Sequence, residues 1–295
     1  MNSQARGRLT AAFTDAGTTG ALHAIDIDTG AALSLTADTP VSTASVHKLC
    51  LIATLYREAA AGRLDPTTPV DIPAAGRAPG PTGLAVMRDA ARLSLRDLAS
   101  LAVAVSDNAA ADLLWAHLGL DTVNATMAAL GLRRTIAVHN QADLYAAMVA
   151  DTGDTGPAAL VEPAAVARLS VLDPARTNRS TPKEIATLLT AIWRDEVCAG
   201  PWGEELRAVL GVQTWSHRLA SGFPYDDVRV SGKTGTLPTL RHEAAVVEYP
   251  DGGRYAIAVF TRAASTAATL PAADAAVGRA ARIAVDALRS RSGTA

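Results

Sequence analysis

The stretch Thr43-Ala44-Ser45-Val46-His47-Lys48 opens a run of apolar residues at helical spacing. The residues Leu49, Ile52, Ala53 and Tyr56 follow at intervals that predict a helix with one apolar face. Ser45 and Lys48 then stand at positions i and i+3, whose side chains share a helix face. Because a serine hydroxyl needs a base within hydrogen-bond reach to attack at neutral pH, this stretch predicts a nucleophile, Ser45, with Lys48 beside it.

Two further short motifs carry chemistry. Ser106-Asp107-Asn108 lies in a turn predicted between two helices, and Lys233-Thr234-Gly235 lies on a predicted strand. Each motif alone is weak evidence, because a helix cap, an interhelix turn or a strand end would explain it. Their joint occurrence, in this order and each in its own structural context, indicates a serine enzyme.

The three motifs suggest a division of work. Lys48 can act as a base only if burial near a second cation lowers its pKa, and Lys233 is the expected cation. Ser106 is expected to relay a proton to the leaving nitrogen, and Asn108 to hold Lys48 and bind the substrate amide. The backbone N–H groups of Ser45 and Thr236 are expected to form the oxyanion hole.

The remaining pattern predicts strands at both ends of the chain and a helical block between them. The N- and C-terminal strands are expected to pair in one antiparallel sheet, with the helical region inserted beside it, in an α/β (α+β) fold. One region would comprise residues 1–44 and 212–295 and the other residues 45–211, with the active site in the cleft between them. Predicted strands cover residues 20–27, 31–36, 228–233, 243–249 and 254–261, and predicted helices cover 45–62, 95–106, 108–118 and 272–289.

Residues 133–180 are rich in Ala, Asp, Gly and Pro, and periodicity does not fix the position of any helix in them, so their fold stays open. A strong helix start follows at Thr181-Pro182-Lys183-Glu184. Thr181 is expected to cap this helix and Pro182 to take its first position, while Glu184 completes a capping box.

The motif set resembles that of the class A β-lactamases and their penicillin-binding-protein-like relatives. The likeness covers most of the chain, and the spacing between Ser45 and Ser106 fits the family. It extends through Leu95–Ala111, through Ser231–Thr236, and through Arg241-His242-Glu243 and Val246-Val247-Glu248-Tyr249-Pro250. The resemblance implies a β-lactamase/transpeptidase-like fold: an antiparallel sheet flanked by helices, with an inserted all-helical region.

The resemblance also implies roles for individual residues. Ser45 would be acylated with the help of Lys48, and Ser106 would shuttle protons. Arg241 would contact a substrate carboxylate, since a guanidinium fork suits that group, although a surface strand arginine is the alternative. Further substrate contacts would come from Asn108, Lys233, Thr234, Gly235 and Thr236.

One family element is missing. Class A enzymes carry an E-x-x-L-N loop whose glutamate activates the water that releases the acyl group, and the sequence does not contain this motif. Glu162-Pro163 begins like that loop but lacks the asparagine. Glu162 is therefore a candidate deacylating base, and the alternative is a solvated glutamate at a helix start.

Composition narrows the class of partner. The 295 residues carry a net charge of −2 and only 4% aromatic residues, which argues against nucleic-acid binding. No apolar run is long enough to span a membrane. His217 and His242 form no metal-binding pattern, so neither a metal nor a cofactor is expected. Residues 1–22 lack the apolar core of a signal peptide, which predicts the cytoplasm, or the periplasm or a secreted protein if a leader has been removed.

Three functions stay open on this pattern. The first is hydrolysis of a β-lactam, or of a related amide or ester that bears a carboxylate, through an acyl-enzyme at Ser45. The second is a biosynthetic acyltransferase or peptidase-like enzyme with weak or no β-lactamase activity, because the E-x-x-L-N loop is absent. The third is a catalytically silent binding module.

Overall fold

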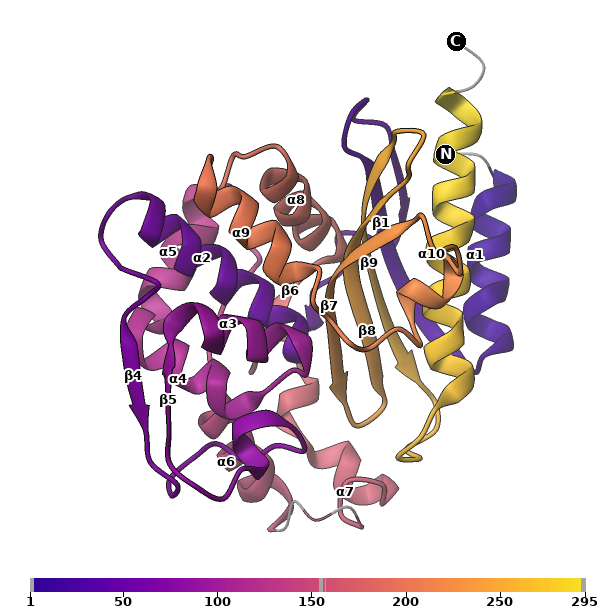
Figure 1. Ribbon diagram of the computed structural model, residues 1–295. Coiled ribbons are helices and arrows are strands. Elements are labelled where there is room, and N and C mark those ends of the chain that lie inside the picture. Colours follow the sequence, from indigo (N-terminus) through magenta and orange to yellow (C-terminus); the bar gives the residue numbers. More distant parts are fainter. Residues whose placement is uncertain (1–2, 154–155, 157, 293–295) are drawn as a thin grey trace.

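The computed structural model describes residues 3–153, 156 and 158–292, and its centre is a five-stranded antiparallel sheet in the order β2-β1-β9-β8-β7 (Figure 1). Strands from both ends of the chain pair in this sheet, which confirms the predicted topology. For example, Leu22 lies opposite Val259 in the pairing of β1 with β9. The strands are β1 (Thr18–Asp26), β2 (Ala32–Leu35), β7 (Arg229–Leu237), β8 (Leu240–Glu248) and β9 (Arg254–Ala263).

Helices cover both faces of the sheet. The terminal helices α1 (Ser3–Asp15) and α10 (Pro271–Ser292) lie together on one face, and α8 (Pro182–Trp193) packs against β1 and β9 on the other (Figure 1). As a result, every residue of β8 from Leu240 to Val247 is buried. Such two-sided burial explains why this strand reads as a nearly continuous apolar run at Ala244–Val247 rather than as an alternating one.

The helical block lies beside the sheet and is built around α2 (Lys48–Ala60). The residues from Lys48 to Tyr56 are all buried, so α2 is enclosed on every side and not along one stripe as the spacing predicted. Around it lie α3 (Leu95–Ala104), α4 (Asn108–Leu118), α5 (Leu120–Ala129) and α9 (Pro201–Leu210). Further out, α6 (Gln141–Thr152) packs against α4, and α7 (Pro163–Arg168) packs against α6.

Short elements join these layers. The two-stranded sheets pair β3 (Val41–Ser42) with β6 (Arg179–Ser180) and β4 (Pro69–Ile72) with β5 (Ala91–Ser94). The segment expected to be irregular between residues 63 and 83 therefore contains a strand. The 3-10 helices are η1 (Ala44–His47), η2 (Gly83–Val86), η3 (Ser170–Leu172) and η4 (Leu219–Gly222).

The predicted capping box of α8 is half formed. The hydroxyl of Thr181 accepts a hydrogen bond from the Glu184 backbone N–H at 3.1 Å, as expected. The Glu184 carboxylate does not return to Thr181 but accepts from Arg134 N at 3.0 Å and from Thr135 Oγ1 at 2.6 Å. The Glu184 side chain therefore ties α8 to the segment at Arg134 and Thr135, about 50 residues earlier in the chain, and local spacing does not predict this contact.

Cys50 and Cys198 are both buried and not bonded to each other. Burial raises the pKa of the Cys198 thiol to about 11, so both are packed thiols with little thiolate character. Among the helices of the described residues, none combines the length and hydropathy needed to cross a membrane.

Candidate active site

Ser45 lies in η1, immediately before α2. The preceding residue, Ala44, has φ of +48°, an uncommon conformation for a residue with a Cβ. Backbone hydrogen bonds from Thr43 N to Asn178 O at 3.0 Å and from Val46 N to Thr43 O at 3.1 Å hold this turn. The surrounding structure thus fixes a strained backbone that presents the Ser45 side chain at the surface of the site.

Strand β7 approaches this turn so closely that only glycine fits at position 235. A Cβ on Gly235 would lie 2.8 Å from Thr43 O and 2.9 Å from Val46 Cγ2. The glycine of the Lys-Thr-Gly motif therefore allows β7 to pack against η1. As a consequence, Thr236, which is exposed on this strand, stands beside Ser45.

The Ser-Asp-Asn turn is locked by its buried aspartate. Asp107 Oδ1 accepts hydrogen bonds from Ala109 N at 2.9 Å and Ala110 N at 3.2 Å, which caps α4. Its Oδ2 accepts from Leu84 N at 2.6 Å and so fastens η2 to the same turn. Ser106 has φ of +60°, and the turn aims its side chain at the two buried lysines.

Lys48 is completely enclosed and hydrogen-bonded to the Ser-Asp-Asn turn. Its Nζ donates to Ser106 O at 2.7 Å, to Asn108 Oδ1 at 3.0 Å and to Asp107 O at 3.2 Å, and lies 3.4 Å from Ser106 Oγ. Burial lowers the pKa of Lys48 to about 7, although the charges of Asp107 and Asp112 oppose this effect. A large fraction of the amine is therefore neutral at physiological pH.

Lys233 approaches the same hydroxyl from β7. Its Nζ donates to Ser106 Oγ at 2.9 Å and to Thr234 O at 2.9 Å. Burial, and then the neighbouring charge of Lys48, hold the pKa of Lys233 well below its ordinary value. The Ser106 hydroxyl thus lies between two desolvated amines, an arrangement suited to moving protons.

A hollow of about 300 Å³, which we call the Arg218 hollow, opens beside Ser45 between the Ser-Asp-Asn turn and β7. Arg218 lines it and donates to Thr236 Oγ1 at 2.8 Å and to Gly235 O at 3.0 Å. The same guanidinium donates to Asp274 Oδ1 at 2.6 Å. Thr234, Thr236, Trp215 and His217 also face this hollow. It therefore offers hydroxyl donors beside a guanidinium whose charge is partly balanced by Asp274.

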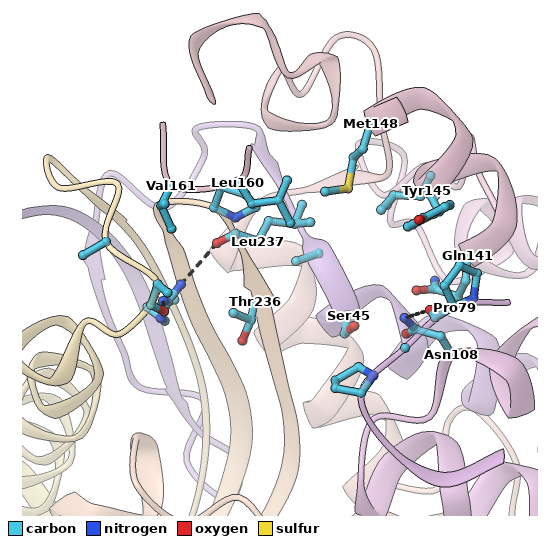
Figure 2. Close-up of a pocket in the computed structure, with 18 residues that line it drawn as sticks. Ser45, Pro79, Asn108, Gln141, Tyr145, Met148, Leu160, Val161, Thr236 and Leu237 are labelled. Atoms are coloured by element: carbon cyan, nitrogen blue, oxygen red, sulfur yellow. Dashed lines mark hydrogen bonds between the residues drawn. The ribbon is translucent and has the colours of Figure 1, made fainter. Parts of the chain in front are cut away.

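A larger pocket of about 490 Å³ opens on the other side of Ser45. Figure 2 shows Ser45 between Thr236 and Asn108, with Leu160, Met148 and Tyr145 across the pocket. Most of the remaining lining of this pocket is apolar as well, so Ser45 lies between two spaces, of which the larger has a largely apolar wall.

A model of the β-lactamase enzyme family matches residues 4–288 of this chain. The chain belongs to the β-lactamase enzyme family. It is 33% identical to the β-lactamase regulatory protein BlaB of Streptomyces cacaoi, over 98% of this chain and 99% of that protein. Its structure matches a β-lactamase of Sphaerobacter thermophilus (TM-score 0.79, 26% identity) over 98% of both chains. It also matches PBP-A (TM-score 0.79, 18% identity), over 98% of this chain and 97% of that one, which is a likeness of fold alone.

Arg241 of this family member is buried, contrary to the alternative of a surface strand arginine. It lines the larger pocket, but its guanidinium donates to Leu237 O, Leu240 O and Ala268 O at 2.8 to 3.2 Å. These bonds brace the β7–β8 turn. The guanidinium that reaches Thr236 belongs instead to Arg218, which no motif marks in the sequence.

Glu162 lies outside both spaces next to Ser45. It is an exposed residue at the start of α7, where its carboxylate accepts a hydrogen bond from Ala165 N at 2.6 Å. The hydrogen bonds from Ala165 and Ala164 hold the pKa of Glu162 below its ordinary value. The structure thus matches the alternative of a solvated glutamate at a helix start and does not bring Glu162 to the site.

A buried acid that sequence reasoning missed stands behind β7. Glu243 accepts hydrogen bonds from Gln213 Nε2 at 2.8 Å and from Leu219 N at 2.7 Å. Burial raises the pKa of Glu243 to about 7. Gln213 Oε1 in turn accepts from the Thr234 N–H at 2.6 Å. Glu243 therefore positions the strand that carries Lys233 and Thr234, although it does not face either pocket.

Proposed function

We propose that this protein is a serine acyl hydrolase that is acylated at Ser45 by a β-lactam or a related carboxylate-bearing amide or ester. The observation that carries the proposal is the Ser106 hydroxyl, placed between Lys48 and Lys233 at 3.4 and 2.9 Å beside Ser45. The site would lie in the cleft between the region of residues 1–44 and 212–295 and the region of residues 45–211.

Acylation begins when Ser45 Oγ attacks the substrate carbonyl carbon. The hydroxyl proton passes to the neutral amine of Lys48, and the backbone N–H groups of Ser45 and Thr236 stabilise the oxyanion. The C–N or C–O bond then breaks, and the proton moves from Lys48 through the Ser106 hydroxyl to the leaving atom. The product is an ester on Ser45, together with a released amine or alcohol for an acyclic substrate or an amine still attached to the acyl group for a β-lactam.

The substrate carboxylate belongs in the Arg218 hollow. Arg218 supplies positive charge there, and the hydroxyls of Thr234 and Thr236 supply donors, whereas Lys233 is fully buried behind the hollow and does not line it. The carboxylate therefore orients the carbonyl next to Ser45, because it fixes one end of the substrate.

Release of the acyl group is expected to be slower than its formation. The described residues that line the two spaces beside Ser45 include neither Asp nor Glu. Activation of water then depends on Lys48, which must return to its neutral form before it can accept a proton from water. Acyl-enzyme therefore accumulates during turnover.

The test is intact-protein mass measured after mixing with a chromogenic cephalosporin, with absorbance followed in the same tube. We expect a mass increase on Ser45 that appears faster than steady colour release and is absent in Ser45→Ala. The proposal is contradicted if the unmodified protein forms no adduct, releases no colour and so behaves as Ser45→Ala does.

A regulatory function is the second candidate, because the curated relative from Streptomyces cacaoi is named a β-lactamase regulatory protein. In that case ligand binding, and not turnover, is the function of the pocket. Ser45→Ala would then keep its affinity for benzylpenicillin in isothermal titration calorimetry while the unmodified protein forms no adduct. An unmodified protein that forms the adduct, with a Ser45→Ala variant that loses both the adduct and the affinity for benzylpenicillin, counts against this candidate.

A further inference from the structure

A groove lined by three arginines lies on the side of the sheet that carries the terminal helices (Figure 1). It is bounded by α1, η4 and α10 and has a volume of about 470 Å³. Arg8 comes from α1, and Arg279 and Arg282 come from α10, whereas neither Asp nor Glu is found among the described residues that line it. We call it the arginine groove. It shares no lining residue with the two spaces beside Ser45, so the proposed chemistry does not account for it.

Arg282 is held in place by its neighbours. Its Nε donates to Asp286 Oδ1 at 2.8 Å, and its Nη1 donates to Tyr225 Oη at 3.2 Å. Its guanidinium carbon also lies 5.4 Å from the ring centroid of Tyr225 and 6.0 Å from that of Phe223. Because Nη2 takes part in neither of these hydrogen bonds, its donors remain for a ligand in the groove.

Arg8 and Arg279 have more freedom to meet an anion. Within the described part of the chain, no hydrogen bond or ion pair engages the guanidinium of Arg8. The Nη1 atom of Arg279 lies 3.5 Å from Asp15 Oδ2, and both side chains of this pair are more than half exposed. An exposed ion pair of this kind contributes little free energy, so an anion in the groove can compete for Arg279.

The wall opposite α1 is formed by backbone that packs directly on α10. A Cβ on Gly222 would collide with Gly278 O, and a Cβ on Gly278 would lie 2.5 Å from Ser221 Oγ. Ser221 and Gly222 line the groove, together with Ile283, which is buried. Since η4 and α10 are in such close contact, this wall is fixed before any ligand arrives.

We propose that the arginine groove binds a small molecule through a phosphate or pyrophosphate group. The guanidinium of arginine matches phosphate oxygens in bidentate geometry and keeps its charge at physiological pH. A pyrophosphate can reach more than one of the three guanidiniums at once. The groove also contains Ala11, Ala275 and Ile283, which can contact an uncharged part of the ligand. Its volume suits a small molecule and not a long polyanion.

The test is isothermal titration calorimetry of the full chain with inorganic pyrophosphate and with inorganic phosphate, in metal-free buffer at constant ionic strength. Pyrophosphate is expected to bind at one site, at least about tenfold more tightly than phosphate, because it gains a second charged hydrogen-bonding partner. Equal affinities, or no binding of pyrophosphate, overturn the proposal. Citrate carries a similar charge on carboxylates, and citrate that binds as tightly as pyrophosphate overturns the assignment to phosphate.

Two substitutions on α1 form a matched pair. Arg6 and Arg8 are both exposed on this helix, but only Arg8 lines the groove. Arg8→Glu should weaken pyrophosphate binding at least about tenfold, because it replaces a charged donor by an acid. Arg6→Glu changes the net charge equally and should weaken binding by about twofold or less, because salt screens the more distant charge. Equal weakening in the two variants would indicate general attraction by surface charge and would overturn the proposal.

A kinetic experiment separates the groove from the Arg218 hollow, which is also expected to attract anions. Pyrophosphate in the arginine groove should not compete with a carboxylate-bearing substrate for Ser45. Competitive inhibition of acylation, with an inhibition constant that equals the calorimetric affinity and is unchanged in Arg8→Glu, would place pyrophosphate in the Arg218 hollow and overturn the proposal. The calorimetric comparison of Arg8→Glu with Arg6→Glu needs no reaction at Ser45, so it tests the groove even if the proposed acylation fails.

Discussion

The rate of Ser45 acylation should depend on the protonation of Lys48, and the burial of Lys48 sets the pH near which the rate changes. Burial takes the pKa of Lys48 from 10.5 to about 7, which corresponds to about 5 kcal/mol between the two protonation states. The base is active when neutral, so the rate must fall as the pH drops through the pKa. The neutral fraction is about one half at pH 7 and about one hundredth at pH 5, so the acylation rate should fall about fiftyfold.

The assay is stopped-flow release of nitrophenolate from one ester between pH 5 and pH 9, at constant ionic strength. Lys48→Arg keeps the positive charge but cannot supply a neutral base, so it should abolish the burst. Lys233→Arg should react more slowly yet keep the fall in rate at low pH, because Lys233 donates to the Ser106 hydroxyl and is not the base. Burial also raises the pKa of Glu243 to about 7, and Glu243→Gln should keep the fall in rate at low pH because this carboxyl faces neither space beside Ser45.

Two results would refute this reasoning. A rate that rises tenfold per pH unit up to pH 9 would mean that Lys48 retains the ordinary pKa of a solvated lysine. An acid limb that disappears in Glu243→Gln, with Lys48 intact, would assign the titration to the buried carboxyl and not to the amine.

Three further predictions concern the framework. Gly235→Ala should lower the unfolding free energy by roughly 1–3 kcal/mol and the rate of acylation at least tenfold, because the new Cβ would press on η1. Denaturant melts measure the stability and the ester burst measures the rate. A variant that is fully active and equally stable contradicts the prediction. Arg218→Ala should lower the unfolding free energy by roughly 3–5 kcal/mol, because it leaves the carboxylate of Asp274 largely buried and poorly paired. Arg254→Ala, at an exposed ion pair, should lower it by under about 1 kcal/mol. Equal losses of unfolding free energy in urea melts of the two variants would refute this difference. Glu162→Gln should leave the rate of colour release from the cephalosporin unchanged, and a large slowing would return this residue to the site.

Much of the fold was predictable because local patterns are strong where elements are regular. The hairpin at residues 20–36 forms, and the strands of the C-terminal third join it in one antiparallel sheet, as expected. The helix α4 begins at Asn108 and ends at Leu118 as predicted, since Asp107 and Gly119 bound it.

The missed helices have weak or conflicting local signals. Helix α1 buries Leu9, Ala12 and Phe13 against the sheet and α10, but its many small and polar residues give little periodicity. Helix α9 starts with Gly200-Pro201, a helix-start signal that could have been used because proline suits the first position. Helix α5 follows α4 with only Gly119 between them, and the φ of +76° at that glycine lets the chain turn at once.

The sequence by itself determined which chemical groups the site contains: a serine with a lysine one helical turn away, a Ser-Asp-Asn turn and a Lys-Thr-Gly strand. Short-range spacing is enough for that, because each motif needs only its own helix, turn or strand. Tertiary structure alone decided that the pKa of Lys48 is lowered and that Arg218, and not Arg241, lies beside Thr236. It also decided that Glu162 lies outside the site and that the wall opposite Ser45 is apolar. These properties depend on burial and on contacts between residues far apart in the chain, such as the 2.9 Å from Lys233 Nζ to Ser106 Oγ, which no local pattern encodes.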